Sequence, residues 1–255
     1  MKKSFVPAIA APILGLAVAG FAMQADAASP TYTQGFDDAT LPSDWIAVNK
    51  STRNATGNPW ATGDGILDAD GNIVVGPYDG AGFAVANYTS IGSGSGTISN
   101  WLISPEFATI SNGDVFSFYT TTTPGSAYPD RLQFLLSAAG AGSNVGTSTT
   151  SVGTFTTTLT TVNSGLAVGG YPDDWTLVSV KVSGLAAPVD GRVAFRYFVT
   201  GGGPTGANSN IIGIDDFSYT SVAAAVPEPA SWAFMAGGLG AIGLVARRRK
   251  ASAQR

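Results

Sequence analysis

Two pairs of aspartates are the residues whose types and positions could do chemistry. Asp37 and Asp38 lie in the segment GFDD, and Asp215 and Asp216 lie in the segment IGIDDF. If these segments lie side by side, four carboxylates would repel one another unless a cation lay among them, and hard oxygen ligands select Ca²⁺. Neighbouring residues of a strand point to opposite faces, so Asp37 and Asp215 are the first candidates, with Asp38 and Asp216 second. The alternative is that all four are solvated aspartates in turns or at N-cap-like positions.

Three further segments look like ligand sites but lack essential residues. The loop DGILDADGN (64–72) has aspartates at EF-hand-like spacing, but Gly71 comes two places too early and no Glu stands at the twelfth position. The segments GSGSG (92–96) and GGGPTG (201–206) neither open a predicted helix nor contain the Lys-Ser/Thr of a phosphate-binding loop. We predict a polar turn for each of the three.

The composition limits catalysis. The chain contains no histidine and no cysteine, which excludes Ser-His-Asp and Cys-His catalysis, disulfides and thiolate metal sites. A glycosidase needs two acids that face each other across a cleft. Asp173 and Asp174 are adjacent in sequence, as are Asp215 and Asp216, and adjacent residues cannot face each other across a cleft. Glu106 and Glu228 are the only glutamates in the chain. We therefore predict a protein that is not an enzyme, with a carboxylate-dependent hydrolase as the alternative.

Several large aromatic residues could stack on sugar rings if they face solvent, as in carbohydrate-binding modules. The interpretation that we favour is that most of them fill the core. The residues in question are Trp45, Trp60, Trp101, Trp175, Tyr128 and Tyr171.

The charges are segregated along the chain. Residues 28–226 contain six basic and fifteen acidic residues, a net charge of −9, whereas all seven of the remaining basic residues lie at the two ends. A domain this acidic repels phosphate backbones, so nucleic acid is not an expected partner. Arg192 and Arg196 lie on one face of a predicted strand, and we expect them to pair with acidic neighbours. A basic binding patch is the alternative.

Short β-type runs alternate with Gly, Pro, Asn and Asp throughout the body of the chain. In one run, Val193, Phe195 and Tyr197 fall on one face while Arg192 and Arg196 fall on the other, and no segment of the body shows helical periodicity. This pattern predicts an all-β fold, an antiparallel β-sandwich (jelly roll), over one domain at 28–221, with a barrel as the alternative. The predicted strands lie within 31–36, 45–49, 82–88, 98–104, 114–120, 131–137, 154–162, 175–182, 191–199 and 211–219.

The N-terminus has the features of a secretory signal peptide. Lys2 and Lys3 precede an apolar run, and Ala25-Asp26-Ala27 supplies a small-residue cleavage site. We predict that residues 1–27 are removed. A retained membrane anchor is the alternative.

The C-terminus has three parts in a fixed order. A linker at 222–231 contains Pro227, Glu228 and Pro229, an apolar segment follows at 232–246, and the basic tail is 247–255. The apolar segment is shorter than the roughly 20 residues that comfortably span a bilayer, and it is rich in glycine, so we predict a short, temporary transmembrane segment. The basic residues that would hold the tail in the cytoplasm are Arg247, Arg248, Arg249 and Lys250.

These three parts together resemble a PEP-CTERM sorting signal. The resemblance implies a protein exported from a Gram-negative bacterium by the general secretion machinery and held transiently in the inner membrane. An exosortase would then recognise the Pro-Glu-Pro motif and remove the tail, and the protein would pass to the cell surface or the extracellular matrix. A plain C-terminal anchor is the alternative.

The body resembles the choice-of-anchor J family, which is related to cleaved adhesin and MAM-like jelly rolls. The resemblance covers roughly residues 31–221 and implies a surface-displayed jelly roll, for which a structural calcium is plausible, without implying a known reaction. We therefore expect a non-enzymatic module for adhesion or extracellular polysaccharide, or else an accessory module of a secreted hydrolase. The segments that carry the resemblance are GFDDATLPSDW (35–45), NWLISPEF (100–107), DRLQFLLS (130–137), GGYPDDWTLVSVKVSGL (169–185), GRVAFRYFV (191–199) and NSNIIGIDDFSY (208–219).

Overall fold

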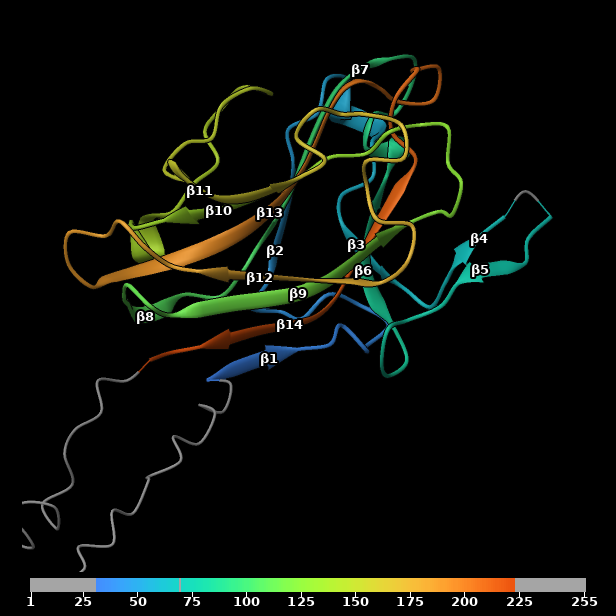
Figure 1. Ribbon diagram of the computed structural model, residues 1–255. Helices are drawn as coiled ribbons and strands as arrows, with labels where there is room; N and C mark the ends of the chain where they lie inside the picture. The colour runs from blue at the N-terminus through green and yellow to red at the C-terminus, as the bar shows by residue number, and fades with distance from the viewer. Residues whose placement is uncertain (1–30, 69, 223–255) are drawn as a thin grey trace, which may run out of the picture.

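The computed structural model describes residues 31–68 and 70–222, which fold into two six-stranded antiparallel sheets and a small two-stranded one (Figure 1). No α-helix occurs in these ranges, only the short 3₁₀ turns η1 (Asn54–Thr56), η2 (Tyr88–Ser90) and η3 (Gly140–Gly142). The strands are β1 (Tyr32–Gln34), β2 (Ile46–Asn49), β3 (Ala61–Gly63), β4 (Ile66–Leu67), β5 (Ile73–Val75), β6 (Phe83–Asn87), β7 (Gly96–Ile103), β8 (Phe107–Ile110), β9 (Val115–Thr122), β10 (Leu132–Ser137), β11 (Thr157–Val162), β12 (Thr176–Lys181), β13 (Val189–Gly202) and β14 (Ile211–Thr220).

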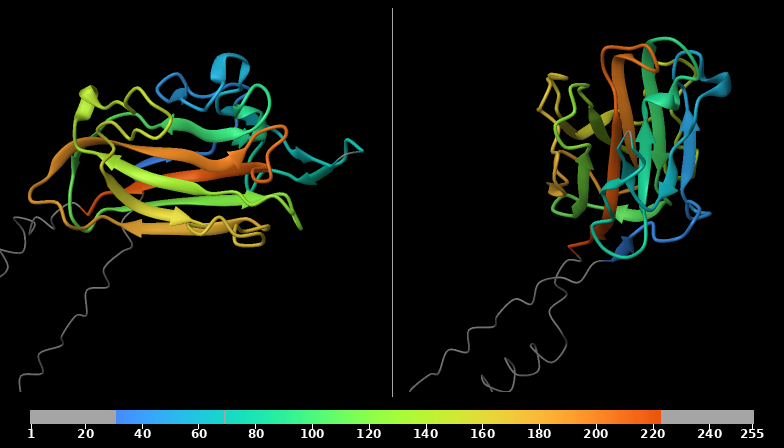
Figure 2. Two further views of the ribbon diagram at one scale, coloured as in Figure 1. Left: turned by 90° about the horizontal axis from the view of Figure 1, so that it is seen from above. Right: turned by 90° about the vertical axis from the view of Figure 1, so that its right-hand side faces the viewer.

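The two large sheets pack face to face as a sandwich with jelly-roll connections (Figure 2). The first sheet has the order β12-β9-β14-β6-β3, with β1 added beside β14, and the second has the order β11-β10-β13-β7-β2, with β8 beside β13. Successive strands such as β6 and β7, β9 and β10, and β13 and β14 lie in opposite sheets at matching positions. This topology excludes the barrel alternative and confirms the predicted fold class.

The core lies between the two sheets and follows the predicted alternation. Val193, Phe195 and Tyr197 of β13 are fully buried on the inner face, as are Leu132 and Phe134 of β10. The first and last strands are neighbours, with Tyr32 opposite Tyr219, so the two aspartate pairs start from adjacent strands. All ten predicted strands are confirmed.

Two segments cover outer faces of the sandwich. The long loop between β10 and β11 packs Val145 and Phe155 against Trp101 on the outer face of the second sheet. The β4–β5 hairpin projects from one end of the molecule, and its base packs Ile66 and Val75 on the first sheet (Figure 1).

The described part of the chain ends beside its own beginning, at the end of the sandwich opposite the β4–β5 hairpin (Figure 1). No helix within the described ranges has the length and apolar character needed to cross a membrane. The predicted signal peptide, the Pro-Glu-Pro motif, the apolar segment and the basic tail lie outside the described residues.

Candidate functional site

The acidic pairs meet where β1 and β14 run side by side. A Cβ placed on Gly35 would lie 2.7 Å from Asp37 Oδ2 and 3.6 Å from Asp216 Oδ1, so these two carboxylates converge above the glycine. Asp216 reaches this position because it has a positive φ of 45° at a break in the β14 register. The residue that approaches Asp37 is thus Asp216, whereas the regular alternation of a strand had favoured Asp215.

Asp215 is fully buried, and backbone amides surround its carboxylate. Its Oδ2 accepts hydrogen bonds from the amides of Tyr78 at 2.8 Å and Asp79 at 3.3 Å, and Oδ1 accepts one from the amide of Asp216 at 2.7 Å. Burial is the main cause that raises the pKa of Asp215 to about 6. Burial also raises the pKa of Asp216, with smaller contributions from the charges of Asp79 and Asp37.

These four residues, Asp37, Asp79, Asp215 and Asp216, form what we call the acidic corner. Asp38 is exposed, and it lines a hollow of about 320 Å³ together with Asp37 and Asp64. Within residues 31–68 and 70–222 no three His, Cys, Asp or Glu side chains are arranged to hold a metal ion. Mutual repulsion in the acidic corner would favour a bound cation, and calcium at this site stays a prediction.

The aromatic residues divide as the core interpretation predicted. Trp45, Trp60, Trp101 and Tyr171 are buried. Trp175 is half-buried, and its indole Nε1 donates a hydrogen bond to the carbonyl of Gly76 at 2.9 Å. Of the six aromatics singled out in the sequence, only Tyr128 is largely exposed, at 51% of its surface.

Neither arginine of β13 forms an ion pair with an acid of residues 31–68 or 70–222, which corrects the sequence expectation. Arg192 donates to the carbonyl of Ser104 at 2.7 Å. Arg196 is 2% exposed; its guanidinium carbon lies 3.8 Å from the ring centroid of Phe198 and 4.7 Å from that of Trp101. It donates to neutral oxygens, including the carbonyl of Thr149 at 2.7 Å. The long loop between β10 and β11 buries this arginine against aromatic faces, a role that strand periodicity does not indicate.

Two of the three predicted polar turns, those within 64–72 and 201–206, are confirmed, whereas the segment 92–96 consists of bends that lead into β7. In the β4–β5 turn, Asp68 Oδ1 accepts hydrogen bonds from the amides of Asp70 and Asn72, each at 2.9 Å. These bonds lower the pKa of Asp68. In the segment 201–206, Gly206 donates to the carbonyl of Gly203 at 2.8 Å, which closes a turn between β13 and β14.

A groove that sequence reasoning missed lies at the hairpin end of the sandwich. Two adjoining hollows of about 550 and 220 Å³ share Tyr88 and Asn210 in their walls. We call these two hollows together the end groove. The residues that complete its walls include Leu67, Asp68, Asn87, Tyr128, Pro204 and Ser209.

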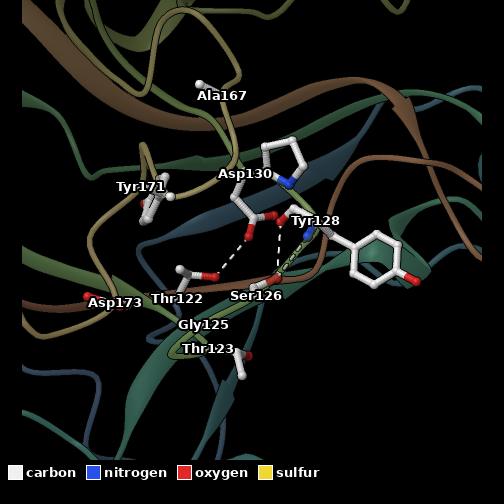
Figure 3. Close-up of a pocket in the computed structure, with 11 residues that line it drawn as sticks. Thr122, Thr123, Gly125, Ser126, Tyr128, Asp130, Ala167, Tyr171 and Asp173 are labelled. Carbon is white, nitrogen blue, oxygen red and sulfur yellow. Dashed lines mark hydrogen bonds between the residues drawn. The ribbon is translucent and has the colours of Figure 1, made fainter.

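The buried carboxyl of Asp130 fixes part of the wall of the end groove. Asp130 has no exposed surface, and its Oδ1 accepts hydrogen bonds from the Tyr197 hydroxyl at 2.5 Å and from the Asn210 amide at 2.8 Å. Figure 3 shows Asp130 bonded to Thr122, while the Tyr128 ring points away from Tyr171. Asp130 thus fixes the backbone of Asn210, one of the two residues that both hollows share.

The protonation state of Asp130 follows from its surroundings. Burial is the largest cause that raises its pKa to about 6, partly offset by its hydrogen bonds. The Thr122 hydroxyl lies 2.8 Å from Asp130 Oδ2 and 2.6 Å from the carbonyl oxygen of Ile211. A hydroxyl has a single proton, so when Thr122 donates it to the carbonyl, a protonated Asp130 completes the network by donating to Thr122.

Comparisons with known proteins identify the C-terminal segment and locate distant structural neighbours. Residues 225–250 match the model described as PEP-CTERM protein-sorting motif. The comparison with curated proteins finds no match.

Among solved structures, the chain is similar to the K3 and K1 cleaved adhesin domains of Lys-gingipain from Porphyromonas gingivalis W83. The K3 match has 19% identity, covers 76% of this chain and 100% of that domain, and has a TM-score of 0.49. The K1 match has 18% identity, coverage of 75% and 98%, and a TM-score of 0.48. The CBM22-1 xylan-binding domain of Paenibacillus barcinonensis Xyn10C matches at 17% identity, with coverage of 79% and 100% and a TM-score of 0.42.

Proposed function

We propose that this chain is an exported protein whose β-sandwich acts, after removal of the C-terminal tail, as a non-enzymatic polysaccharide-binding module at the cell surface or in the extracellular matrix. The observation that carries the proposal is the sorting motif at 225–250. In the proposed sequence of events, the secretion machinery exports the chain, the apolar segment at 232–246 holds it briefly in the inner membrane of a Gram-negative bacterium, and an exosortase cleaves near the Pro-Glu-Pro motif.

The charge of the body supports polysaccharide rather than nucleic acid as the polymer bound. Its net charge of −9 repels a phosphate backbone. A protein released into the matrix is surrounded by polysaccharide, and binding to it requires no reacting group on the protein.

A hydrolase is the second candidate, because Asp130 has the raised pKa of a general acid and shares a pocket with Asp173. That pocket measures only about 50 Å³, less than twice the roughly 30 Å³ that one water molecule occupies in the liquid. Both oxygens of Asp130 also lie in hydrogen bonds with neighbouring residues. These features favour a structural role for Asp130 over an acid that reaches a glycosidic oxygen.

The export step is tested by substituting Glu228, the acidic residue of the motif. In the native host, the Glu228→Ala variant should stay in the membrane fraction with its tail attached, whereas the wild type is released without it. Glu106→Ala is a matched control, since it removes the other glutamate of the chain, which is exposed on the body. Release of the Glu228 variant at the wild-type level, with the same mass, would contradict processing at this motif.

A further inference from the structure

Two exposed tyrosines face the same groove. Tyr88 exposes 41% of its surface and Tyr128 exposes 51%, and both line the smaller hollow of the end groove. Tyr78, the third tyrosine with comparable exposure, differs from them because its ring stacks on Tyr119 with the centroids 3.6 Å apart. In the end groove, two aromatic side chains therefore lie at the surface beside a hollow.

The segments that carry these rings are held in place by hydrogen bonds. The amide of Tyr88 donates to the carbonyl of Asn210 at 2.8 Å, and Asn87 Oδ1 caps the η2 turn by accepting from Thr89 at 2.9 Å. Below Tyr128, the amide of Ser209 donates to the carbonyl of Pro129 at 3.0 Å. Backbone that is already ordered before binding loses little conformational entropy when a ligand arrives.

The remaining groups of the end groove are neutral hydrogen-bonding groups and one carboxylate. Asn87 and Asn210 supply side-chain amide groups, and Asn210 Nδ2 is oriented by a 3.1 Å hydrogen bond to Ser126 Oγ. Ser209 is buried, and its hydroxyl accepts a hydrogen bond from the Gly203 amide at 3.0 Å. Asp68 supplies a negative charge, and its lowered pKa keeps it ionised. Among the described residues that line the two hollows, none is Lys or Arg. This set can bond to hydroxyl groups, while the charge of Asp68 opposes an anionic ligand.

We propose that the end groove binds an uncharged polysaccharide chain, with sugar rings stacked on Tyr88 and Tyr128 and hydroxyl groups bonded to Asn87 and Asn210. This inference rests on the proposed binding function and assigns it a site and a ligand class. The apolar faces of sugar rings pack on aromatic rings, and their hydroxyls need the neutral donors and acceptors that line both hollows. The combined size of the hollows is in the range that protein ligand sites occupy.

The position of the end groove suits a protein attached through its C-terminus. β14 begins at Ile211 in the wall of the groove and ends at Thr220, two residues before the last described residue. Ten residues of strand span about 33 Å, so the groove lies at the far end of β14 from the point where the described part of the chain ends.

The test uses protein purified from its native host and affinity electrophoresis through gels that contain one polysaccharide each. The neutral probes are hydroxyethylcellulose, galactomannan and dextran, and the anionic probes are alginate and hyaluronan. At least one neutral polysaccharide should retard the wild type, and the anionic ones should not. Tyr88→Ala and Tyr128→Ala should each weaken that retardation by about tenfold or more, as expected for an aromatic anchor. Tyr88→Phe and Tyr128→Phe, which keep the ring, should retain most of it.

Tyr78→Ala is the matched control, because it removes an equally exposed tyrosine outside the end groove. Thermal melting of each variant shows whether it has folded. Retardation by a neutral polysaccharide that survives both Tyr→Ala changes would overturn the site while leaving polysaccharide binding intact. Retardation by the anionic probes alone would overturn the ligand class. If none of the five probes, nor polysaccharide isolated from the host, retards the folded wild type, both the inference and the proposed binding function fail.

Discussion

Replacing Asp130 with asparagine should remove a pH dependence of stability that the buried carboxyl creates. The folded protein raises the pKa of Asp130 from 3.8 to about 6, chiefly through burial. The folded state therefore binds this proton more tightly than the unfolded state does. The resulting stabilisation is fully present below about pH 4 and is lost as the pH rises through about 6. A shift of about two units corresponds to about 3 kcal/mol.

Asparagine can satisfy the same neighbours without a charge. Its Oδ1 can accept from the Tyr197 hydroxyl and the Asn210 amide, as Asp130 Oδ1 does. Its Nδ2 can donate to the Thr122 hydroxyl, which is then free to donate to the Ile211 carbonyl. The Asp130→Asn variant should thus keep the hydrogen bonds of the protonated acid at every pH.

The assay is thermal or denaturant unfolding of the wild type and the variant at about pH 4 and about pH 7.5. Between these two pH values, the wild type should lose about 3 kcal/mol of unfolding free energy relative to Asp130→Asn. For a domain of this size, that loss corresponds to about 6–12 °C in melting temperature. Asp215 and Asp216 also have raised pKa values, but both proteins contain them, so the comparison isolates Asp130. Asp174→Asn, a change at an exposed side chain, is the control and should follow the wild type. Parallel stability curves for the wild type and Asp130→Asn would refute the reasoning.

Two further predictions concern the acidic corner and the buried arginine. Added calcium should raise the melting temperature at neutral pH, and EDTA should reverse the rise. The rise should be smaller in Asp216→Asn. A melting temperature that changes neither with calcium nor with EDTA would contradict a calcium site. Arg196→Ala should lower the unfolding free energy by about 3 kcal/mol, because it removes contacts with two aromatic rings and leaves buried oxygens without a donor. The control Lys181→Ala, at the exposed end of β12, should change the unfolding free energy by less than about 0.5 kcal/mol. An equal effect of Arg196→Ala and Lys181→Ala would show that the buried contacts of Arg196 contribute little.

The sequence predicted the regular part of the fold because hydrophobic alternation reports burial directly. In β13, alternate residues such as Val193 and Phe195 face the core, and this period of two is visible without any structure. The short strands β3, β4, β5 and β8 were not predicted. Strands of two to four residues show little of such a period, and tertiary contacts decide whether they pair.

The candidate site depends on features that strand periodicity does not report. Asp216 reaches Asp37 through a residue with positive φ that interrupts β14, whereas a regular strand would turn one aspartate of the pair away. Tyr88 and Tyr128 come from two different connections, and they share a groove only because the jelly-roll topology brings those connections to one end. Tyr88 carried no signal in the sequence, since one tyrosine after a strand resembles any other.

The most direct test of the account is incubation of the mature protein with polysaccharide isolated from its host, followed by two readings of one sample. Co-sedimentation reports binding, and size-exclusion chromatography of the recovered polymer reports its chain length. A non-enzymatic binding module should sediment with the polysaccharide and leave its length unchanged. Protein that stays in the supernatant, or polymer that becomes shorter, would contradict it.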